Sequence, residues 1–451
     1  MMTSTQQKLV RFSLTALTCA LLASCGGGGS SNTSSDNNTD NNNSGNIGVC
    51  SVADEKQRFL NYMRDQYFWY RDIPSNVNLA AYADTYALLE GIRSAPDRFS
   101  FLLTEQEYQD RYVNAEFIGF GFGSRVEQQR VFINYVFADS PAERAGIRRG
   151  DELVRINGNL VSTLIEQDAY NNALGASQVG VSVELEWRKP NNEVMRAVVS
   201  KDYVETNTVL ATEKFTVDGK QVGYFVLNSF INRTGADLNS AYNQLTGVDE
   251  LIIDVRYNGG GLIRYANQAA TQAAGNNVIG QVFTRFIYND KNSSNNQTEL
   301  FQLYDGVRQL NLDRVYVLTT AASCSSSEMI INSLKPFVEV VVIGSRTCGK
   351  PVGQSPRQIC DKRTFVVNFE TVNADNEGRY FDGIPADCSI ADVLVGDWGD
   401  VNDPLLVASR NHITTGSCDA PGAAMSFSQQ SSADQPIPDR ATIGEQWRQE
   451  F

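Results

Sequence analysis

The sequence predicts an α/β domain built from parallel βαβ units, together with a smaller second domain and a helical N-terminal region. From about residue 220, apolar runs of strand length alternate with amphipathic runs of helix length. Runs such as "LIID" and "VVVI" lack polar alternation, which is typical of parallel strands buried on both faces. A layer of helices packed on a parallel sheet satisfies both observations.

The elements expected in this domain follow one another in chain order. The predicted strands are "QVGYFVLNSF", "ELIIDVR", "RVYVLTT" and "VEVVVIG". The predicted helices between them are "ADLNSAYNQLT", "LIRYANQAATQAAG" and "SSSEMIINSLK". In open parallel sheets, functional sites form beyond the carboxyl ends of the strands, so the loops that follow these strands are the first candidates.

Composition limits the classes of function. The 451 residues are 42% hydrophobic and 20% charged, which indicates a globular chain long enough for two or three domains. The formal net charge of −14 argues against a nucleic-acid partner, because phosphates require a basic face. With one histidine and no CxxC spacing, no metal site and no cofactor are expected. No apolar run of 18 residues or more follows the first 25 positions, so no transmembrane helix is predicted.

The first 25 residues have the pattern of an export signal. Lys8 and Arg11 supply positive charge, and residues 12–22 form an apolar core too short to span a bilayer. The segment that ends this core, residues 22–25 ("LASC"), resembles the bacterial lipobox, in which the cysteine is lipidated. Ordinary secretion with cleavage near Ala23 is the alternative.

Lipidation at Cys25 would anchor the protein in the bacterial cell envelope. Gly26 after the cysteine favours the outer membrane by the same resemblance, facing the periplasm or the cell surface. Residues 26–49 are rich in Gly, Ser and Asn and are expected to be a flexible linker. The membrane is therefore expected to be a partner through the lipid anchor only.

Residues 50–114 are expected to be a helical region with an aromatic stripe in its core. Five large side chains stand mostly three or four positions apart: Phe59, Tyr62, Met63, Tyr67 and Trp69. At the other end of the chain, residues 419–451 are rich in Ser, Gln and Pro and are expected to be disordered.

Residues 115–203 resemble the PDZ family. Their segment "SPAERAGIRRGDELVRING" predicts a short helix ending at Gly146, a turn, and then a strand. In that family an apolar-Gly-apolar loop binds a peptide's C-terminal carboxylate, and the peptide adds a strand to the sheet. The candidate peptide-binding residues in that loop are Gly119, Phe120, Gly121 and Phe122. A hairpin with glycines for turn geometry alone is the alternative.

Three loops follow predicted strands of the α/β domain: residues 257–261 ("YNGGG"), 321–328 ("AASCSSSE") and 345–354 ("SRTCGKPVGQ"). Ser325 stands three residues before a glutamate, which is capping-box spacing, so an N-cap role is one interpretation of that serine. Lys350 follows after one helix and one strand, so it should return to the same edge of the sheet. A serine cluster, a glycine loop and a lysine are therefore expected to converge.

These loops resemble the C-terminal processing (tail-specific) serine peptidases, a family with a Ser-Lys dyad. "SCSSSEMI" is similar to the family's "SASASEI", "TCGKPVGQ" to its "TFGKGxxQ", and "DVRYNGGGL" to its "DLRxNPGGL". "FDGIPAD" and "PDRFSFL" also have counterparts in the family, and the resemblance spans roughly residues 55–410. The chain departs from the family pattern at Cys324, Ser326, Cys348, Gly259 and Pro351.

The resemblance implies roles for named residues in a peptidase domain at 204–418, which would be crotonase-like. Ser325 would be the nucleophile, Lys350 the general base, and Gln354 the residue that orients the lysine. A lysine accepts a proton only when neutral, so its pKa must fall from about 10.4 toward 7 or 8 through burial. The N–H of Ser326 would be one oxyanion donor, and the second would come from the glycine loop, with Gly260 favoured over Gly261.

The function implied is a serine endopeptidase that captures unfolded or C-terminal polypeptide segments on its PDZ domain. The alternative is a catalytically inactive PDZ scaffold at the cell envelope, which would normally have lost Ser325, Lys350 or Gln354. A β-lactamase-like enzyme is disfavoured because no SxxK or KTG is present, and an α/β-hydrolase because GxSxG is absent. The sequence leaves open an adaptor protein and a homo-oligomer.

Six cysteines remain after export and lipidation, and they allow 15 complete pairings. Cys360 and Cys388 bracket an apparent hairpin and are expected to pair. Cys50 and Cys418 bound the folded region and are expected to join its two ends. That assignment leaves Cys324 and Cys348, for which we expect a bond between the two catalytic loops, with two buried free thiols as the alternative.

Overall fold

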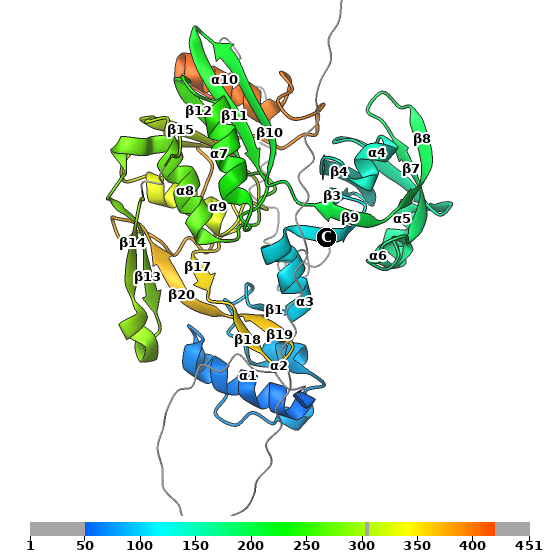
Figure 1. Ribbon diagram of the computed structural model, residues 1–451, viewed down its shortest axis with the longest axis vertical. Helices are drawn as coiled ribbons and strands as arrows, with labels where there is room; N and C mark the ends of the chain where they lie inside the picture. The colour runs from blue at the N-terminus through cyan, green and yellow to red at the C-terminus, as the bar shows by residue number, and fades with distance from the viewer. Residues whose placement is uncertain (1–49, 303–305, 420–451) are drawn as a thin grey trace, which may run out of the picture. The chain divides into compact units, whose positions relative to one another are not determined.

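The computed structural model describes residues 50–302 and 306–419 (Figure 1). The predicted export signal, the lipidation site Cys25, the linker up to residue 49 and residues 420–451 of the predicted tail lie outside the described residues. Within the described part of the chain, no helix has the length and apolar character needed to cross a membrane.

A six-stranded sheet forms the centre of the α/β domain, in the order β10-β11-β12-β15-β16-β21. β11, β12, β15, β16 and β21 pair in parallel, and β10 is antiparallel to β11. The strands are Val209–Val217 (β10), Lys220–Leu227 (β11), Glu250–Asp254 (β12), Arg314–Thr319 (β15), Glu339–Gly344 (β16) and Cys388–Ser389 (β21).

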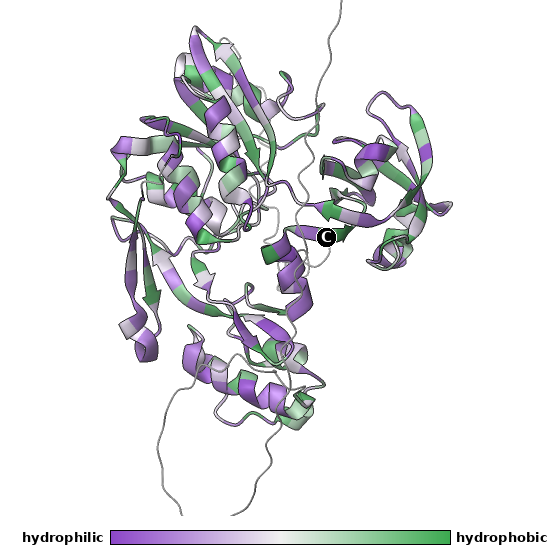
Figure 2. Cartoon of the chain, viewed as in Figure 1, coloured by the Kyte–Doolittle hydropathy of each residue, from purple (hydrophilic) through white to green (hydrophobic). Residues whose placement is uncertain are grey.

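Helices cover both faces of this sheet (Figure 1). Three connect consecutive parallel strands, and α10 lies on the opposite face. They are Thr234–Gln244 (α7), Ile263–Ala274 (α8), Ser326–Leu334 (α9) and Pro404–Thr415 (α10). In β12, Leu251 and Ile253 belong to the core under α7 to α9, and Ile252 belongs to the core under α10. This double burial is why the strand has no polar alternation in sequence. The buried residues of α7 recur mostly at spacings of three and four, as expected of a helix with one face on the sheet: Thr234, Leu238, Ala241 and Tyr242. Hydrophilic residues also occur along this helix (Figure 2).

A four-stranded antiparallel sheet lies beside the central one, in the order β14-β13-β20-β17. Its strands are Val282–Tyr288 (β13), Gln297–Leu300 (β14), Val352–Gln354 (β17) and Val367–Val372 (β20). The short helical turns Gly275–Asn277 (η4) and Asp290–Asn295 (η5) flank β13. Since β17 contains Gln354 and begins two residues after Lys350, this sheet holds the segment expected to carry the general base.

The N-terminal region is mainly helical, as expected, but it also contributes a strand. Its helical elements are Val52–Gln66 (α1), Tyr70–Asp72 (η1), Leu79–Ala81 (η2), Thr85–Ile92 (α2), Glu105–Tyr108 (α3) and Gln109–Asn114 (η3). The strand Phe101–Thr104 (β1) pairs with Lys362–Phe365 (β19), which pairs in turn with Arg357–Ile359 (β18). Phe59, Met63 and Tyr67 are buried against Val352 and Val367, so much of the predicted aromatic stripe is core.

Residues expected to form the PDZ domain fold around a core of their own. The sheet has the order β3-β4-β5-β7-β8, with β3 at an edge and β6 paired to β5. The strands are Phe122–Glu127 (β3), Arg130–Val136 (β4), Glu152–Ile156 (β5), Asn159–Leu160 (β6), Ser182–Arg188 (β7) and Val194–Ser200 (β8). The helices are Pro141–Ala145 (α4), Val161–Glu166 (α5) and Tyr170–Ala173 (α6), and Glu116–Gly119 (β2) pairs with Asp202–Glu205 (β9).

The predicted helix of this domain ends where the sequence indicated. Helix α4 stops at Gly146, whose φ of 88° lies in the left-handed region that glycine adopts without strain. Ser140 caps the other end by accepting a hydrogen bond from the Glu143 N–H.

Two of the three expected disulfide pairings are wrong. The structure joins Cys50 to Cys360 and Cys388 to Cys418, with Cα–Cα distances of 5.7 and 5.9 Å. The segment between Cys360 and Cys388 is not a hairpin, because β19 pairs with β1 and β18 whereas β20 pairs with β13 and β17. Cys360 therefore lies in the core beneath α1, and Cys388 lies with Cys418 in the core beneath α10.

The third expected pairing agrees with the structure. Cys324 is bonded to Cys348 across a Cα–Cα distance of 5.2 Å, which lies within the range that disulfides require. This bond links the loop after β15 to the loop after β16.

We expect a peptide map of the unreduced, alkylated protein to contain three cross-linked pairs, Cys50–Cys360, Cys324–Cys348 and Cys388–Cys418. Mass spectrometry after digestion measures these links, and reduction before digestion is the control. A peptide that joins Cys360 to Cys388 would contradict the arrangement of the two cores.

Candidate active site

Three loops meet at the carboxyl edge of the central sheet. They follow β12, β15 and β16, which are adjacent and parallel, so their ends lie at one edge. The Cys324 N–H donates to the Asn258 carbonyl at 3.0 Å, and the Cys348 N–H donates to the Ser323 carbonyl at 3.1 Å. The serine loop is therefore bonded to the glycine loop on one side and to the lysine loop on the other.

The serine cluster contains three hydroxyls with structural hydrogen bonds and one without. The Ser323, Ser326 and Ser327 hydroxyls donate to backbone carbonyls at 2.8, 2.8 and 2.9 Å. All three of these side chains are buried, whereas Ser325 is half-buried. Within the described residues, the Ser325 hydroxyl donates to no acceptor. Ser325 is thus the one member of the cluster with a hydroxyl available for chemistry.

Ser325 occupies the N-cap of α9, but in a strained conformation. Its φ of 55° and ψ of −114° differ from the extended backbone usual for an N-cap. Such a conformation costs about 1–3 kcal/mol in a residue other than glycine, and it persists only where surrounding contacts impose it. The N-cap position predicted from the Ser325–Glu328 spacing is correct, yet this geometry exceeds what capping alone requires.

Lys350 is a buried lysine whose side chain bonds to no carboxylate in the part of the chain that the structure describes. Its ammonium group donates to Gln354 Oε1 at 2.9 Å, and the side chain is 7% exposed. Gln354 is held in turn because its Nε2 donates to the Phe99 carbonyl at 2.7 Å. Burial lowers the pKa of Lys350 to about 8, while the charges of Asp97 and Glu328 oppose that shift.

No hydrogen bond joins Ser325 Oγ to Lys350 Nζ among the described residues. Hydrogen bonds between a nucleophile and its base commonly tighten only when substrate binds. Both side chains belong to loops tied together by the Cys324–Cys348 bond, so the two groups belong to one site.

The glycine loop comes close to Ser325 at Gly260. A Cβ at this position would lie 2.7 Å from the Ser325 Cβ and 3.2 Å from the Ser326 nitrogen, and φ is +105°. The Gly260 N–H donates to Asn258 Oδ1 at 2.8 Å, so that donor is already engaged. Among the described residues, the N–H groups of Ser326 and Gly261 have no acceptor, whereas the N–H of Gly260, the glycine favoured from sequence, is not free.

A buried ion cluster fixes the start of the glycine loop. Arg256 is fully buried and bonds to Asp254 through Nε and Nη2, to Asp392 at 2.8 Å and to Asp403 at 2.9 Å. Burial opposes the charge of Arg256, but the carboxylates of Asp254 and Asp403 raise its pKa well above the usual range. The guanidinium is therefore charged, and it anchors residues 254–256 to Asp392, in the segment before α10, and to Asp403, the N-cap of that helix.

One group of side chains has the composition of a metal site, formed by Cys324, Glu328 and Cys348. Both sulfur atoms are used in the disulfide, and both oxygens of Glu328 accept hydrogen bonds from the catalytic loops. These three residues therefore offer no free set of metal ligands while the disulfide is formed.

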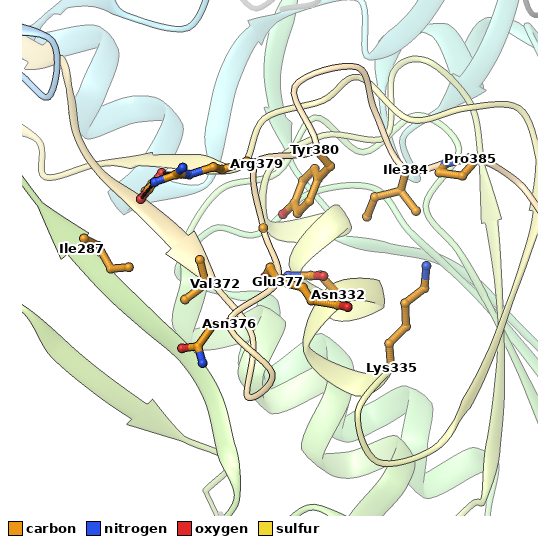
Figure 3. Close-up of a pocket in the computed structure, with 12 residues that line it drawn as sticks. Ile287, Asn332, Lys335, Val372, Asn376, Glu377, Arg379, Tyr380, Ile384 and Pro385 are labelled. Carbon is orange, nitrogen blue, oxygen red and sulfur yellow. Dashed lines mark hydrogen bonds and ion pairs between the residues drawn. The ribbon is translucent and has the colours of Figure 1, made fainter.

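A pocket of about 600 Å³ lies at the opposite end of α9 and contains none of the predicted site residues (Figure 3). Lys335 extends from the end of the helix toward Ile384 and Pro385, and Tyr380 covers another side. Neither Ser325 nor Lys350 lines this cavity.

The predicted peptide-binding loop lies at the start of edge strand β3. Phe120 is buried in the domain core, and Gly121 has a φ of +85°. A Cβ on Gly121 would lie 2.2 Å from the Ser140 Cβ, so close packing requires glycine there. The outer edge of β3 pairs with no strand among the described residues, which is the geometry that strand addition uses.

Sequence reasoning missed three contributors to the site. Arg98 donates to the carbonyls of Cys348 and Phe381 at 2.7 and 2.9 Å. It thereby connects the N-terminal region to the lysine loop. Phe99 supplies the carbonyl that holds Gln354. The motif "PDRFSFL" pointed to both residues without indicating a role. Glu328 was interpreted only as a capping residue.

Comparison with known proteins agrees with this arrangement. The chain matches the Peptidase family S41 over residues 221–390, the Peptidase S41 N-terminal domain over 54–101 and the PDZ domain over 132–189. A crystal structure of an S41 protease from Bacteroides fragilis NCTC 9343 superposes with a TM-score of 0.65 at 25% identity. That match covers 79% of this chain and 97% of the other.

Curated relatives include C-terminal processing proteases. A "Probable CtpA-like serine protease" of Staphylococcus aureus (strain COL) is 25% identical over 281 residues, 61% of this chain and 53% of the relative. "Carboxyl-terminal-processing peptidase 3, chloroplastic" of Arabidopsis thaliana is 26% identical over 304 residues, 64% of this chain and 56% of the relative. The chain thus spans about half the length of the curated relatives it matches.

The buried lysine predicts how the reactivity of Ser325 depends on pH. Below the Lys350 pKa of about 8 the side chain is an ammonium and cannot accept a proton, and above it the neutral amine predominates. The rate at which a fluorophosphonate probe labels Ser325 should therefore rise with pH through about 8. Mass spectrometry of the labelled peptide measures this rate, and Lys350→Met should abolish the rise. A rate that stays flat from about pH 6 to about pH 9 would contradict the assignment of Lys350 as base.

Proposed function

The chain belongs to peptidase family S41 and carries a PDZ domain, and from that premise we propose that it is a serine endopeptidase of unfolded or C-terminal polypeptide segments. The observation that supports this most is that an uncommitted Ser325 hydroxyl and the buried Lys350 stand on two loops joined by the Cys324–Cys348 bond. A lysine whose pKa is about 8 is partly neutral near physiological pH and can act as a general base.

In the proposed reaction, Lys350 Nζ takes the proton of the Ser325 hydroxyl as Oγ attacks the carbonyl carbon of the peptide bond. The resulting oxyanion accepts hydrogen bonds from the Ser326 N–H, at the positive end of α9, and from an N–H of the glycine loop. Gly261 is the favoured second donor because the Gly260 N–H is engaged with Asn258.

Collapse of the tetrahedral intermediate breaks the C–N bond and leaves an acyl group on Ser325 Oγ. The lysine returns its proton to the leaving amine. Lys350 then takes a proton from water, whose oxygen attacks the ester carbonyl carbon. Collapse of this second intermediate breaks the bond between the acyl carbon and Ser325 Oγ, Lys350 returns its proton to Oγ, and the acyl group leaves as a carboxylic acid. Gln354 supports both half-reactions because a neutral amide orients the amine without stabilising the ammonium as a carboxylate would.

We propose that the PDZ domain captures substrate at the outer edge of β3. An extended peptide would pair with this edge and place its terminal carboxylate at Gly119, Phe120, Gly121 and Phe122. The lipidation of Cys25 and a location in the cell envelope belong to the same proposal. A crotonase-like assignment of the 204–418 domain likewise rests on the family resemblance.

The dyad is tested by single substitutions. Ser325→Ala and Lys350→Ala should each reduce cleavage of unfolded casein to background, because the two groups act as one unit. Thermal unfolding of Ser325→Ala should stay close to wild type, since the Ser325 hydroxyl donates no structural hydrogen bond. Fragments are counted by mass spectrometry, with the chain lacking residues 1–25 as the enzyme.

Lys335→Ala is the matched control, because it removes an exposed lysine at the far end of the same helix. This variant should keep wild-type activity. Full activity of Ser325→Ala would refute the mechanism. Peptide binding without any cleavage by the wild-type protein would instead favour the inactive PDZ scaffold.

Capture by the carboxylate is tested with one peptide in two forms. A peptide with a free C-terminus should bind the protein more tightly than its C-terminal amide, by about tenfold or more, because the amide cannot act as an anionic acceptor. Isothermal titration with Ser325→Ala measures both affinities without cleavage. Equal affinities would mean that the loop does not bind the carboxylate. Gly121→Val is unsuited to this test, because its side chain would collide with Ser140.

A further inference from the structure

One carboxylate contacts the backbone of both proposed catalytic residues. Glu328 is fully buried in the first turn of α9. Its Oε2 accepts hydrogen bonds from the N–H groups of Ser325 and Lys350, both at 2.8 Å. Its Oε1 accepts from the Gly349 N–H at 2.8 Å and from the Thr347 hydroxyl at 2.5 Å.

This arrangement differs from that of an ordinary capping box. In a capping box the glutamate accepts from its own N-cap residue, three positions earlier in the chain. Helix α3 provides the ordinary case within the same molecule, where Glu107 accepts from the Thr104 N–H and hydroxyl. Glu328 makes the local bond to Ser325 and adds three bonds to a loop 19 to 22 residues away.

The contacts require an ionised carboxylate. Four donors point at its two oxygens, and only the anion can accept from all four. A protonated carboxyl group or an amide would turn one position into a donor and leave buried N–H groups without acceptors. Burial raises the pKa of Glu328, and the hydrogen bonds from Thr347, Lys350, Gly349 and Ser325 oppose that shift.

The contact with Glu328 stabilises the strained backbone of Ser325. The backbone of Ser325 holds a φ of 55°, and its N–H is directed at Glu328 Oε2. The same oxygen receives the Lys350 N–H, so one atom fixes the nucleophile's backbone and the base's backbone. The Cys324–Cys348 bond ties the same two loops covalently, one residue before the serine and two before the lysine.

We propose that Glu328 is a positioning residue, whose single ionised carboxylate holds Ser325 and Lys350 at a fixed separation. This inference rests on the proposed function, since it concerns the same pair of residues. It assigns to Glu328 a role in the rate of the chemical step and none in substrate capture.

The titratable groups that face this carboxylate determine how its charge affects the pKa of Lys350. Lys350 faces it from the lysine loop, Arg98 from the N-terminal region and Tyr380 from the loop after β20. Asp97 is the other negative charge that acts on Lys350. Loss of the Glu328 charge should therefore lower the pKa of Lys350 further, because one of the two opposing carboxylates is removed.

The test compares Glu328→Gln with Glu107→Gln, which changes the glutamate of the ordinary capping box. Casein-derived peptide hydrolysis is followed for kcat, KM and the pH profile. Glu328→Gln should lower kcat by about 100-fold with KM little changed, because small misplacement of reacting groups has that effect. In the pH–rate profile of Glu328→Gln, the midpoint of the acid limb should move below the wild-type value of about 8. Glu107→Gln should match wild type in kcat and in this midpoint.

A second variant separates position from charge. Glu328→Asp keeps the charge but withdraws the carboxylate by one methylene, so kcat should fall while the acid limb stays near the wild-type value. If circular dichroism shows that Glu328→Gln does not fold, the proposal is tested with Glu328→Asp by measuring kcat and the midpoint of the acid limb. A folded Glu328 variant with wild-type kcat overturns the proposal. Equal loss in the Glu107 and Glu328 variants also overturns it, since a general stability effect would then suffice. No hydrolysis by wild type and all variants would refute the proposed function and, with it, this role for Glu328.

Discussion

The burial of Lys350 without a carboxylate partner is the constraint on which the site depends. An isolated ammonium is costly to bury, and each unit of pKa depression corresponds to about 1.4 kcal/mol. The protein meets this constraint with the neutral Gln354 and with the ring of Phe99, 5.8 Å from the lysine nitrogen. Because Phe99 also supplies the carbonyl that holds Gln354, the N-terminal region completes the site as well as covering it.

The parallel sheet explains why the other groups meet this lysine. β12, β15 and β16 end at one edge, and their loops carry the glycines, the serines and the lysine respectively. Asn258 joins the first two loops, because its carbonyl accepts from the Cys324 N–H and from the Ser327 hydroxyl. The ion cluster around Arg256 and the Cys324–Cys348 bond then fix the outer two loops. Strain at Ser325 can persist because the surroundings are held on every side.

Local patterns predicted much of this architecture. The alternation of apolar and amphipathic runs located the strands and helices of the α/β domain, because a strand buried on both faces is a continuous apolar run in the sequence. Motif resemblance selected Ser325, Lys350 and Gln354, and the structure adds that the neighbouring serine hydroxyls are engaged elsewhere. The spacing of Ser325 and Glu328 predicted the helix start but gave no sign of the bonds from Glu328 to the lysine loop. Those bonds join residues distant in sequence, and no local rule contains them.

The disulfide pairing also depends on contacts between residues distant in sequence. Cys360 and Cys388 flank a segment that resembles a hairpin, yet its strands pair with β1, β13 and β17 from remote parts of the chain. The pairing of strands that are far apart in sequence depends on which hydrophobic core each strand joins, and the spacing of cysteines along the chain does not predict this. The engagement of the Gly260 N–H by Asn258 is likewise a tertiary detail that the glycine motif alone does not reveal.

The central claim is that Lys350 is a base near neutral pH, and its titration can be observed directly. With lysine labelled at 13Cε, one resonance should titrate with a midpoint near the pKa of about 8, and Lys350→Met should remove that resonance. If every lysine resonance instead titrates near the ordinary value of about 10.4, Lys350 is an ammonium at neutral pH and the account is contradicted.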